Sequence, residues 1–287
     1  MSIDREQTPL LELRGVSADY AASGRLLRRR PAAPAISGID FEIHPGETLA
    51  FVGESGSGKS TTGRVVLRLL PVMAGSVHFA GRDLAEWGAK TPLEYRRQVQ
   101  AVFQDPSASL NPRHLVASAL EIPLRRHGVT DRRDIRMRID RAFEMVGLDR
   151  DHIGRFPNEL SGGQQQRVAI ARALVLEPRL VVCDEAVSAL DMSTQGQIIN
   201  LLKELQEETG VAYLFIAHDL GLVRHIADRV GVMSQGRLVE LAETDALFAN
   251  PRDPYTRRLL DATPASSPDG RDDRRAQRIA DRAGVAG

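Results

Sequence analysis

Short apolar runs alternate along the chain with longer segments whose apolar positions recur at helical spacing. Segments with helical spacing occupy 59–70, 161–176 and 192–209, and Gly210 after the last one is a typical helix stop. Strands that alternate with helices predict an α/β fold with a mostly parallel sheet. Runs typical of buried or half-buried strands occur at 10–20, 36–43, 48–52, 76–80, 180–183, 211–216 and 229–233.

The middle of the chain follows a different pattern. From about 93 to 160 the segments are helical and rich in arginine, and residues 105–160 are predicted to be inserted into the α/β core. Residues 21–34 contain two prolines and a run of arginines, which predicts a loop. After residue 262 the chain is rich in Pro, Ser, Asp and Arg, so residues 263–287 are expected to form a flexible tail.

Charge and cysteine content exclude several classes of protein. The 287 residues carry 38 Lys+Arg and 38 Asp+Glu, and this balance gives no overall attraction to nucleic acid or to an anionic membrane. The arginines between 125 and 141 have acidic residues among them, which favours a solvated helix face over a nucleic-acid patch. No apolar run approaches the roughly 18 residues of a membrane-spanning helix, and residues 1–7 contain no secretory h-region. The lone Cys183 excludes a disulfide framework, so the chain is expected in a reducing cytosol.

A glycine-rich turn after the strand at 48–52 has the pattern of a phosphate-binding loop. Residues 53–60 read GESGSGKS and fit G-x-x-x-x-G-K-[ST] in full, with a strand before them and a helix after them. The glycines let backbone N–H groups face a phosphate chain at a helix N-terminus. Lys59 would bridge the β- and γ-phosphates, and the Ser60 hydroxyl would hold Mg²⁺. A chance Gly/Ser-rich turn is the alternative, and it is rare in this context.

Two other strands end in polar residues suited to hydrolysis. The apolar run at 180–183 leads into Asp184, which can hold Mg²⁺, and Glu185, which can act as general base on water. The strand at 211–216 is followed by His218, whose imidazole could contact the γ-phosphate. Each signal is weak alone, since acidic turns and surface histidines are common. Cys183 is interpreted as a small core residue.

A second glycine motif opens the helix at 161–176. Residues 160–164 read LSGGQ, in which Ser161 and Gln164 have the spacing of a capping box. Two glycines in a first helical turn cost about 1 kcal/mol each relative to alanine, which calls for a reason. We interpret them as clearing side chains so that the helix N-terminus can approach another phosphate. Two copies bound head-to-tail would then share two nucleotides, each copy offering one motif to each site.

Together these motifs resemble the nucleotide-binding subunit of an ABC transporter. Residues 53–60 match Walker A, 180–185 match Walker B, and 160–164 match the signature. The resemblance implies a P-loop NTPase (RecA-like) core with an antiparallel β subdomain and an inserted α-helical subdomain at about 105–165, all within residues 1–262. It further implies that Gln104 is the Q-loop residue, Asp191 belongs to the D-loop and Tyr20 stacks on adenine.

The resemblance also assigns a role to each matching residue. It implies catalytic roles for Glu185, His218 and Gln104, and Mg²⁺ binding by Ser60, Gln104 and Asp184. The residues expected to bind ATP are Tyr20, Gly53, Glu54, Ser55, Gly56, Ser57, Gly58, Lys59, Ser60, Thr61, Ser161, Gly162, Gly163, Gln164 and Asp191.

Within that family the chain is similar to the dipeptide/oligopeptide/nickel import group. The strings at 103–113, 184–191, 218–220 and 250–256 carry this similarity. It implies uptake of peptides at the cytoplasmic face of the cell membrane, with a second ATPase subunit, two permease subunits and, indirectly, a substrate-binding protein. Import of nickel or glutathione, export, and a non-transport ABC ATPase acting on nucleic acid or the ribosome remain alternatives. The C-terminal iron–sulfur cysteines of some members are missing here, so no such cluster is expected.

Overall fold

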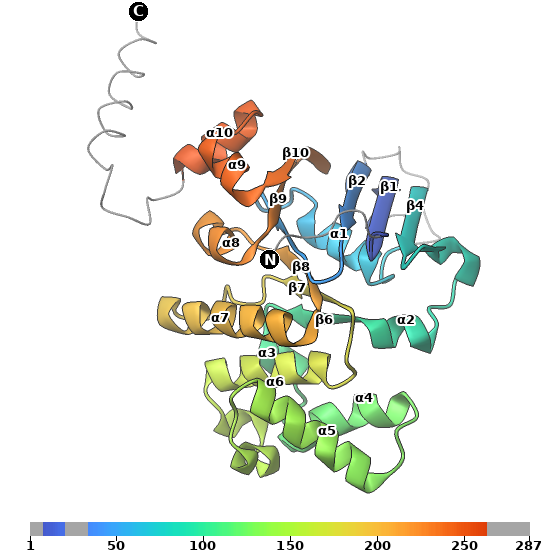
Figure 1. The fold of residues 1–287 in the computed structure, drawn as a ribbon, viewed down its shortest axis with the longest axis vertical. Coiled ribbons are helices and arrows are strands. Elements are labelled where there is room, and N and C mark those ends of the chain that lie inside the picture. The colour runs from blue at the N-terminus through green and yellow to red at the C-terminus, as the bar shows by residue number, and fades with distance from the viewer. Residues whose placement is uncertain (1–7, 21–33, 263–287) are drawn as a thin grey trace, which may run out of the picture.

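The computed structural model describes residues 8–20 and 34–262, which contain a six-stranded and a four-stranded sheet (Figure 1). The larger sheet has the order β10-β9-β3-β8-β7-β6. Its strands are β3 (Thr48–Val52), β6 (Val99–Phe103), β7 (Leu180–Asp184), β8 (Ala212–Ile216), β9 (Arg229–Ser234) and β10 (Arg237–Glu243). Neighbouring strands run parallel except β10, which pairs antiparallel with β9. The predicted α/β fold with a mostly parallel sheet is confirmed.

The smaller sheet is antiparallel and has the order β2-β1-β4-β5. It consists of β1 (Leu11–Ala18), β2 (Ile36–Ile43), β4 (Ala74–Phe79) and the short β5 (Arg82–Asp83). In Figure 1 it stands beside α1 (Lys59–Val66) at the upper right. Alternate residues of β1 and β2 are buried, which is the pattern of a sheet with one face against the core.

Helices pack around the larger sheet and extend beyond it. The α-helices after α1 are α2 (Leu93–Gln98), α3 (Pro106–Ser109), α4 (Val116–Arg126), α5 (Arg132–Met145), α6 (Gly162–Leu174), α7 (Met192–Thr209), α8 (Leu220–Ile226), α9 (Thr244–Ala249) and α10 (Pro254–Ala262). Short 3₁₀ turns in the described part of the chain include η2 (Leu84–Trp87), η3 (Arg150–Gly154) and η4 (Pro157–Glu159). Gly210 ends α7 in a left-handed conformation, as predicted from the sequence.

The alternation of side chains along the central strands divides the described core into two clusters. Val181 and Cys183 of β7 belong to one cluster, which includes α6 and α7. Leu180 and Val182 belong to the other, which includes the smaller sheet and Val65 of α1. Successive residues of a strand point to opposite faces, so α1 and α6 cover opposite faces of the larger sheet. Burial raises the pKa of the Cys183 thiol to about 12, which fits its predicted place in the core.

Helices α3, α4 and α5 lie between β6 and α6 in the chain and form the lower part of Figure 1. The prediction that 93–160 is helical is wrong for one segment, because β6 within that range is a strand. β6 is the edge strand beside β7 and is only partly buried, so its apolar pattern is weak. The predicted helix at 59–70 ends early at Val66, where Arg68 turns to a positive φ of 53°. Most of the predicted loop at 21–34 and the tail at 263–287 lie outside the described residues.

Candidate functional site

The glycine-rich turn connects β3 to α1 and packs closely against β9. Gly53 has a φ of 145°, and a Cβ there would lie 2.1 Å from the carbonyl oxygen of Met233. Gly58 is the N-cap of α1 with a φ of 105°. Both positions therefore require glycine, for space and for backbone conformation. The turn ends at the N-terminus of α1, where unpaired backbone N–H groups favour an anion.

The side chain of Lys59 is buried within this loop. Its Nζ donates hydrogen bonds to the carbonyl oxygens of Gly53 (2.7 Å) and Glu54 (2.9 Å) and to Ser57 Oγ (3.3 Å). Burial lowers the pKa of Lys59, while the carboxylates of Glu185 and Asp184 act in the opposite direction. The ammonium group thus lies within electrostatic reach of both acidic residues predicted at the end of β7.

Ser60 and Asp184 meet at the junction of α1 and β7. Ser60 Oγ donates a 2.7 Å hydrogen bond to Asp184 Oδ1, although the residues are 124 positions apart. A hydroxyl and a carboxylate are oxygen donors of the kind that Mg²⁺ prefers, and Mg²⁺ keeps other positions for water and phosphate. The donor set therefore fits a magnesium ion, which Ser60 and Asp184 would hold.

The register of the sheet brings two other predicted residues to the same edge. Asp184 pairs with Phe103 of β6 on one side and with Ile216 of β8 on the other. Gln104 directly follows Phe103, and His218 lies two residues beyond Ile216. Both are exposed at the carboxyl ends of their strands, the edge at which ligands bind in open α/β sheets.

Glu185 has an unusual backbone conformation. Its φ is 52°, in the left-handed region, which costs a non-glycine residue about 1–2 kcal/mol. Its N–H donates to the Ile216 carbonyl at 2.9 Å, and its own carbonyl accepts from the N–H (3.1 Å) and Oγ (3.0 Å) of Ser188. These bonds fix a strained turn at a half-exposed carboxylate, a combination that clusters at functional sites.

Tyr20 lies against the first turns of α1. Its hydroxyl is 3.2 Å from Thr61 Oγ1 and accepts a 2.6 Å hydrogen bond from Arg64 Nη1. The Arg64 guanidinium carbon also lies 5.6 Å from the centre of the Tyr20 ring. The ring is 45% exposed beside the phosphate loop, so it is accessible to a base.

The second glycine motif forms the predicted capping box. Ser161 is the N-cap of α6, and its N–H donates to Gln164 Oε1 (2.9 Å) while its Oγ accepts from the Gln164 N–H (3.3 Å). Gln164 Nε2 lies 3.1 Å from His152 Nε2, which ties the cap to η3. The Ser161–Gly162 turn is exposed, as a surface for a second molecule requires.

Gly163 is also needed for a contact inside the chain. A Cβ there would lie 2.8 Å from Cγ2 of Thr194 on α7, whereas a Cβ at Gly162 would meet Leu190 at an ordinary 3.8 Å. Thr194 in turn donates from its N–H (3.0 Å) and Oγ1 (2.7 Å) to the carboxylate of Asp191, the N-cap of α7. These hydrogen bonds hold the pKa of Asp191 below its usual value. Asp191 and the signature turn are therefore joined through one threonine.

The family model for the ABC transporter matches residues 36–188. The chain belongs to the ABC transporter family. A second model, the oligopeptide/dipeptide transporter C-terminal region, matches residues 239–284 of this ABC chain. Its fold is that of ABC ATP-binding domains. CbiO1 from Clostridium perfringens, part of the ABC transporter complex cbiONQ, superposes with a TM-score of 0.75 at 27% identity, covering 85% of this chain and 92% of the other.

Further relatives of this ABC chain carry names from the import group. The oligopeptide transport ATP-binding protein OppF of Bacillus subtilis is 49% identical over 242 residues, covering 84% of this chain and 79% of OppF. The glutathione import ATP-binding protein GsiA of Salmonella paratyphi A is 47% identical over 264 residues, covering 92% of this chain. The chain spans 42% of the length of GsiA. A dimeric ATP-binding cassette bound to ADP and Pi superposes with a TM-score of 0.69 at 28% identity, covering 82% of this chain and 98% of the other.

Sequence reasoning missed two residues of this ABC site. Arg64 donates to the Tyr20 hydroxyl, and the only signal of this in the sequence is that Arg64 follows Thr61 by three residues, which places both on one face of the helix. Thr194 is three residues after Asp191, a spacing typical of an N-cap that accepts from the N3 residue. That spacing is readable from the sequence, whereas its contact with Gly163 depends on how α6 and α7 pack.

Proposed function

We propose that this chain is the ATP-binding and ATP-hydrolysing subunit of an ABC importer that takes up peptides. The observation that carries the proposal is the meeting of Ser60 with Asp184 beside Lys59 and the strained Glu185. These residues combine a phosphate-binding loop, a pair of Mg²⁺ ligands and a fixed carboxylate. That is the set of groups that phosphoryl transfer to water requires.

In the proposed mechanism the loop N–H groups and Lys59 bind the phosphates of ATP, and Tyr20 stacks on the adenine. Ser60 and Asp184, with Gln104, would hold Mg²⁺, which would supply positive charge near the phosphates. Glu185 accepts a proton from the attacking water, and its rigid turn keeps the carboxylate in one orientation. His218, at the end of the neighbouring strand, contacts the γ-phosphate.

The second nucleotide contact comes from another copy of the chain or from a similar subunit. α1 and α6 cover opposite faces of the larger sheet, so the phosphate loop and the Ser161–Gln164 turn of one chain do not face each other. A head-to-tail pair places the turn of each subunit over the nucleotide of the other. The similar cassette bound to ADP and Pi is a dimer, which supports the pairing of two such subunits.

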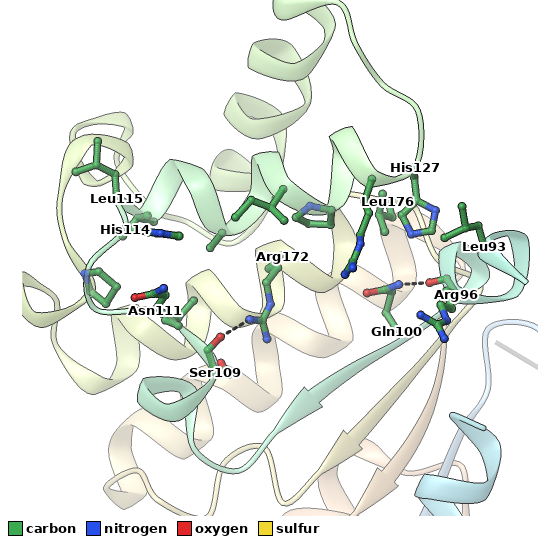
Figure 2. A pocket seen from close by; sticks show the side chains of 17 residues that line it. Leu93, Arg96, Gln100, Ser109, Asn111, His114, Leu115, His127, Arg172 and Leu176 are labelled. Carbon is green, nitrogen blue, oxygen red and sulfur yellow. Dashed lines mark hydrogen bonds between the residues drawn. The ribbon is translucent and has the colours of Figure 1, made fainter. Parts of the chain in front are cut away.

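A groove between the core and the α3–α4 region suits the permease. It has a volume of about 350 Å³ and lies between α2 and β6 on one side and α4 on the other (Figure 2). Leu93, Leu115 and Ile122 are exposed along it. Arg172 of α6 supports its inner wall, because its Nη1 donates to the Ser109 carbonyl at 2.6 Å. We propose that a cytoplasmic helix of the permease binds there, at the inner face of the cell membrane.

Strand β6 connects that groove to the nucleotide. Gln100 of β6 lines the groove, and Gln104 follows the end of the same strand beside Asp184. A rigid strand between the two places gives a direct physical link between permease contact and nucleotide state. None of the described helices is long and apolar enough to cross a membrane. Contact with the permease through the groove is the attachment to the membrane that we propose.

Two separate observations favour peptides as the cargo and argue against a nucleic-acid ATPase. The relatives OppF and GsiA are named for oligopeptide transport and glutathione import, and glutathione is itself a small peptide, so peptides are the proposed cargo. A nucleic-acid ATPase would need free basic charge. On α5, however, Arg136 pairs with Asp140 (3.0 Å) and Arg138 with Asp134 (2.8 Å).

The proposal is tested by reconstituting the chain with its two permease subunits in vesicles. Substrate-binding proteins loaded with oligopeptides, glutathione or a nickel chelate are then added separately. We expect ATP hydrolysis to rise with a peptide-loaded protein. If ATP hydrolysis rises only with the protein loaded with the nickel chelate, the cargo is nickel and not a peptide. ATP hydrolysis that responds to RNA or DNA but not to the permease would overturn the importer assignment.

A further inference from the structure

The C-terminal part of the described chain returns to the phosphate loop through Tyr255. The N–H of Glu54 donates a 3.1 Å hydrogen bond to the Tyr255 hydroxyl, across 201 positions of sequence. Glu54 directly follows Gly53 in the loop, and Tyr255 lies in the first turn of α10. The motifs of nucleotide binding assign no role to this tyrosine.

Tyr255 is held firmly in place. Asp253 Oδ1 accepts a 2.7 Å hydrogen bond from the N–H of Tyr255. The carboxylate of Glu240 on β10 accepts from the N–H groups of Arg252 (2.8 Å) and Asp253 (3.0 Å). The Tyr255 ring also packs against the core cluster that contains α6 and α7. Its hydroxyl is therefore presented to the loop by an ordered frame.

Other contacts from the same region reach the loop on either side of Glu54. Gly53 packs on the Met233 carbonyl of β9, and the N–H of Gly236 donates to the Ser57 carbonyl at 3.0 Å. The loop is thus fixed at 53, 54 and 57 by residues 233–255. Fixing the backbone at these three points limits the orientations open to the other N–H groups of the loop, which are the groups that a phosphate would contact.

We propose that Tyr255 is a positioning residue that fixes the phosphate loop through the Glu54 N–H and thereby raises the affinity for ATP. Tyr255 itself does not contact the nucleotide. The inference rests on the proposed ATP binding at this loop. It gives the region at 239–284, matched by the oligopeptide/dipeptide C-terminal model, a function in the nucleotide site.

The test uses the full-length chain and Tyr255→Phe, which removes only the hydroxyl oxygen. In nucleotide-free protein we expect the Glu54 amide to exchange with deuterium about three- to tenfold faster, as loss of one hydrogen bond predicts. The Kd for Mg-ATP should rise severalfold, while the hydrolysis rate at saturating ATP and the unfolding temperature stay the same. Asp253→Ala, which loosens the tyrosine, should act in the same direction with a smaller effect.

Tyr213→Phe is the matched control, because the buried Tyr213 hydroxyl of β8 has no hydrogen-bond partner among the described residues. It should leave the Glu54 exchange rate and the Kd unchanged. Unchanged exchange and Kd in Tyr255→Phe would overturn the positioning role. Failure of the wild-type chain to bind ATP would instead overturn the proposed function, and the exchange rate would still decide whether Tyr255 holds the loop.

Discussion

The 2.7 Å hydrogen bond from Ser60 Oγ to Asp184 Oδ1 joins the end of the phosphate loop to the end of β7. Replacement of Ser60 by alanine removes one of the proposed oxygen ligands of Mg²⁺ and leaves the Asp184 carboxylate in place. We expect Ser60→Ala to require at least about tenfold more Mg²⁺ for half-maximal ATP hydrolysis, as expected for loss of a metal ligand or its support. The measurement is hydrolysis rate against Mg²⁺ concentration at fixed ATP.

Ser76→Ala is the control for that titration, because Ser76 lies on β4 of the smaller sheet. Its magnesium dependence should match the wild-type chain. If ATP hydrolysis by Ser60→Ala and Ser76→Ala depends equally on the Mg²⁺ concentration, Ser60 is not a ligand of the metal.

The contact between Gly163 and Thr194 predicts a pair of effects on stability. Gly→Ala within a helix usually stabilises by up to about 1 kcal/mol. Gly162→Ala should gain part of this, whereas Gly163→Ala should destabilise because its Cβ would lie 2.8 Å from Thr194 Cγ2. Thr194→Ser removes that methyl and keeps the hydroxyl, so it should restore stability in the Gly163→Ala background. Denaturant unfolding of Gly162→Ala, Gly163→Ala and the Gly163→Ala/Thr194→Ser double variant measures both effects.

If Gly163→Ala is as stable as Gly162→Ala, the packing of α6 on α7 does not require glycine. The two glycines would then serve only the approach of a phosphate. If Thr194→Ser restores the stability of Gly163→Ala but not its ATP hydrolysis, Gly163 serves both the packing of α6 on α7 and the approach of a phosphate.

A substitution in the groove shown in Figure 2 is expected to weaken permease binding without changing ATP hydrolysis by the isolated chain. Leu115→Asp places a charge among the exposed apolar side chains of the groove, and Leu115 is not one of the residues proposed to bind the nucleotide. We expect the isolated variant to hydrolyse ATP at the wild-type rate but to lose at least about tenfold in affinity for the permease, since interface anchors often contribute 2 kcal/mol or more. Co-purification and ATP hydrolysis in reconstituted vesicles are the two measurements.

Met137→Asp provides the comparison, because Met137 is exposed on α5 outside that groove. It should bind the permease normally. If Leu115→Asp also binds the permease normally, the permease contacts a surface other than this groove.

The sequence predicted most of the fold and the residue types of the site, since these depend on local patterns. Gly210, the capping box at Ser161 and the buried strand ending at Asp184 all follow from short-range spacing. β6 was missed because an edge strand has one neighbour and keeps partly exposed residues. The hydrogen bond of Glu54 to Tyr255 and the close packing of Gly163 against Thr194 could not be predicted, because tertiary packing alone brings their elements together.

Glu185→Gln removes the proposed base and keeps the size of the side chain. ATP binding and ATP hydrolysis are measured on the same preparation, with Glu204→Gln on the exposed surface of α7 as control. We expect Glu185→Gln to bind Mg-ATP with at least wild-type affinity and to lose about 10²- to 10⁴-fold in hydrolysis rate. Hydrolysis at the wild-type rate would show that Glu185 is not the base and that the proposed mechanism of hydrolysis is wrong.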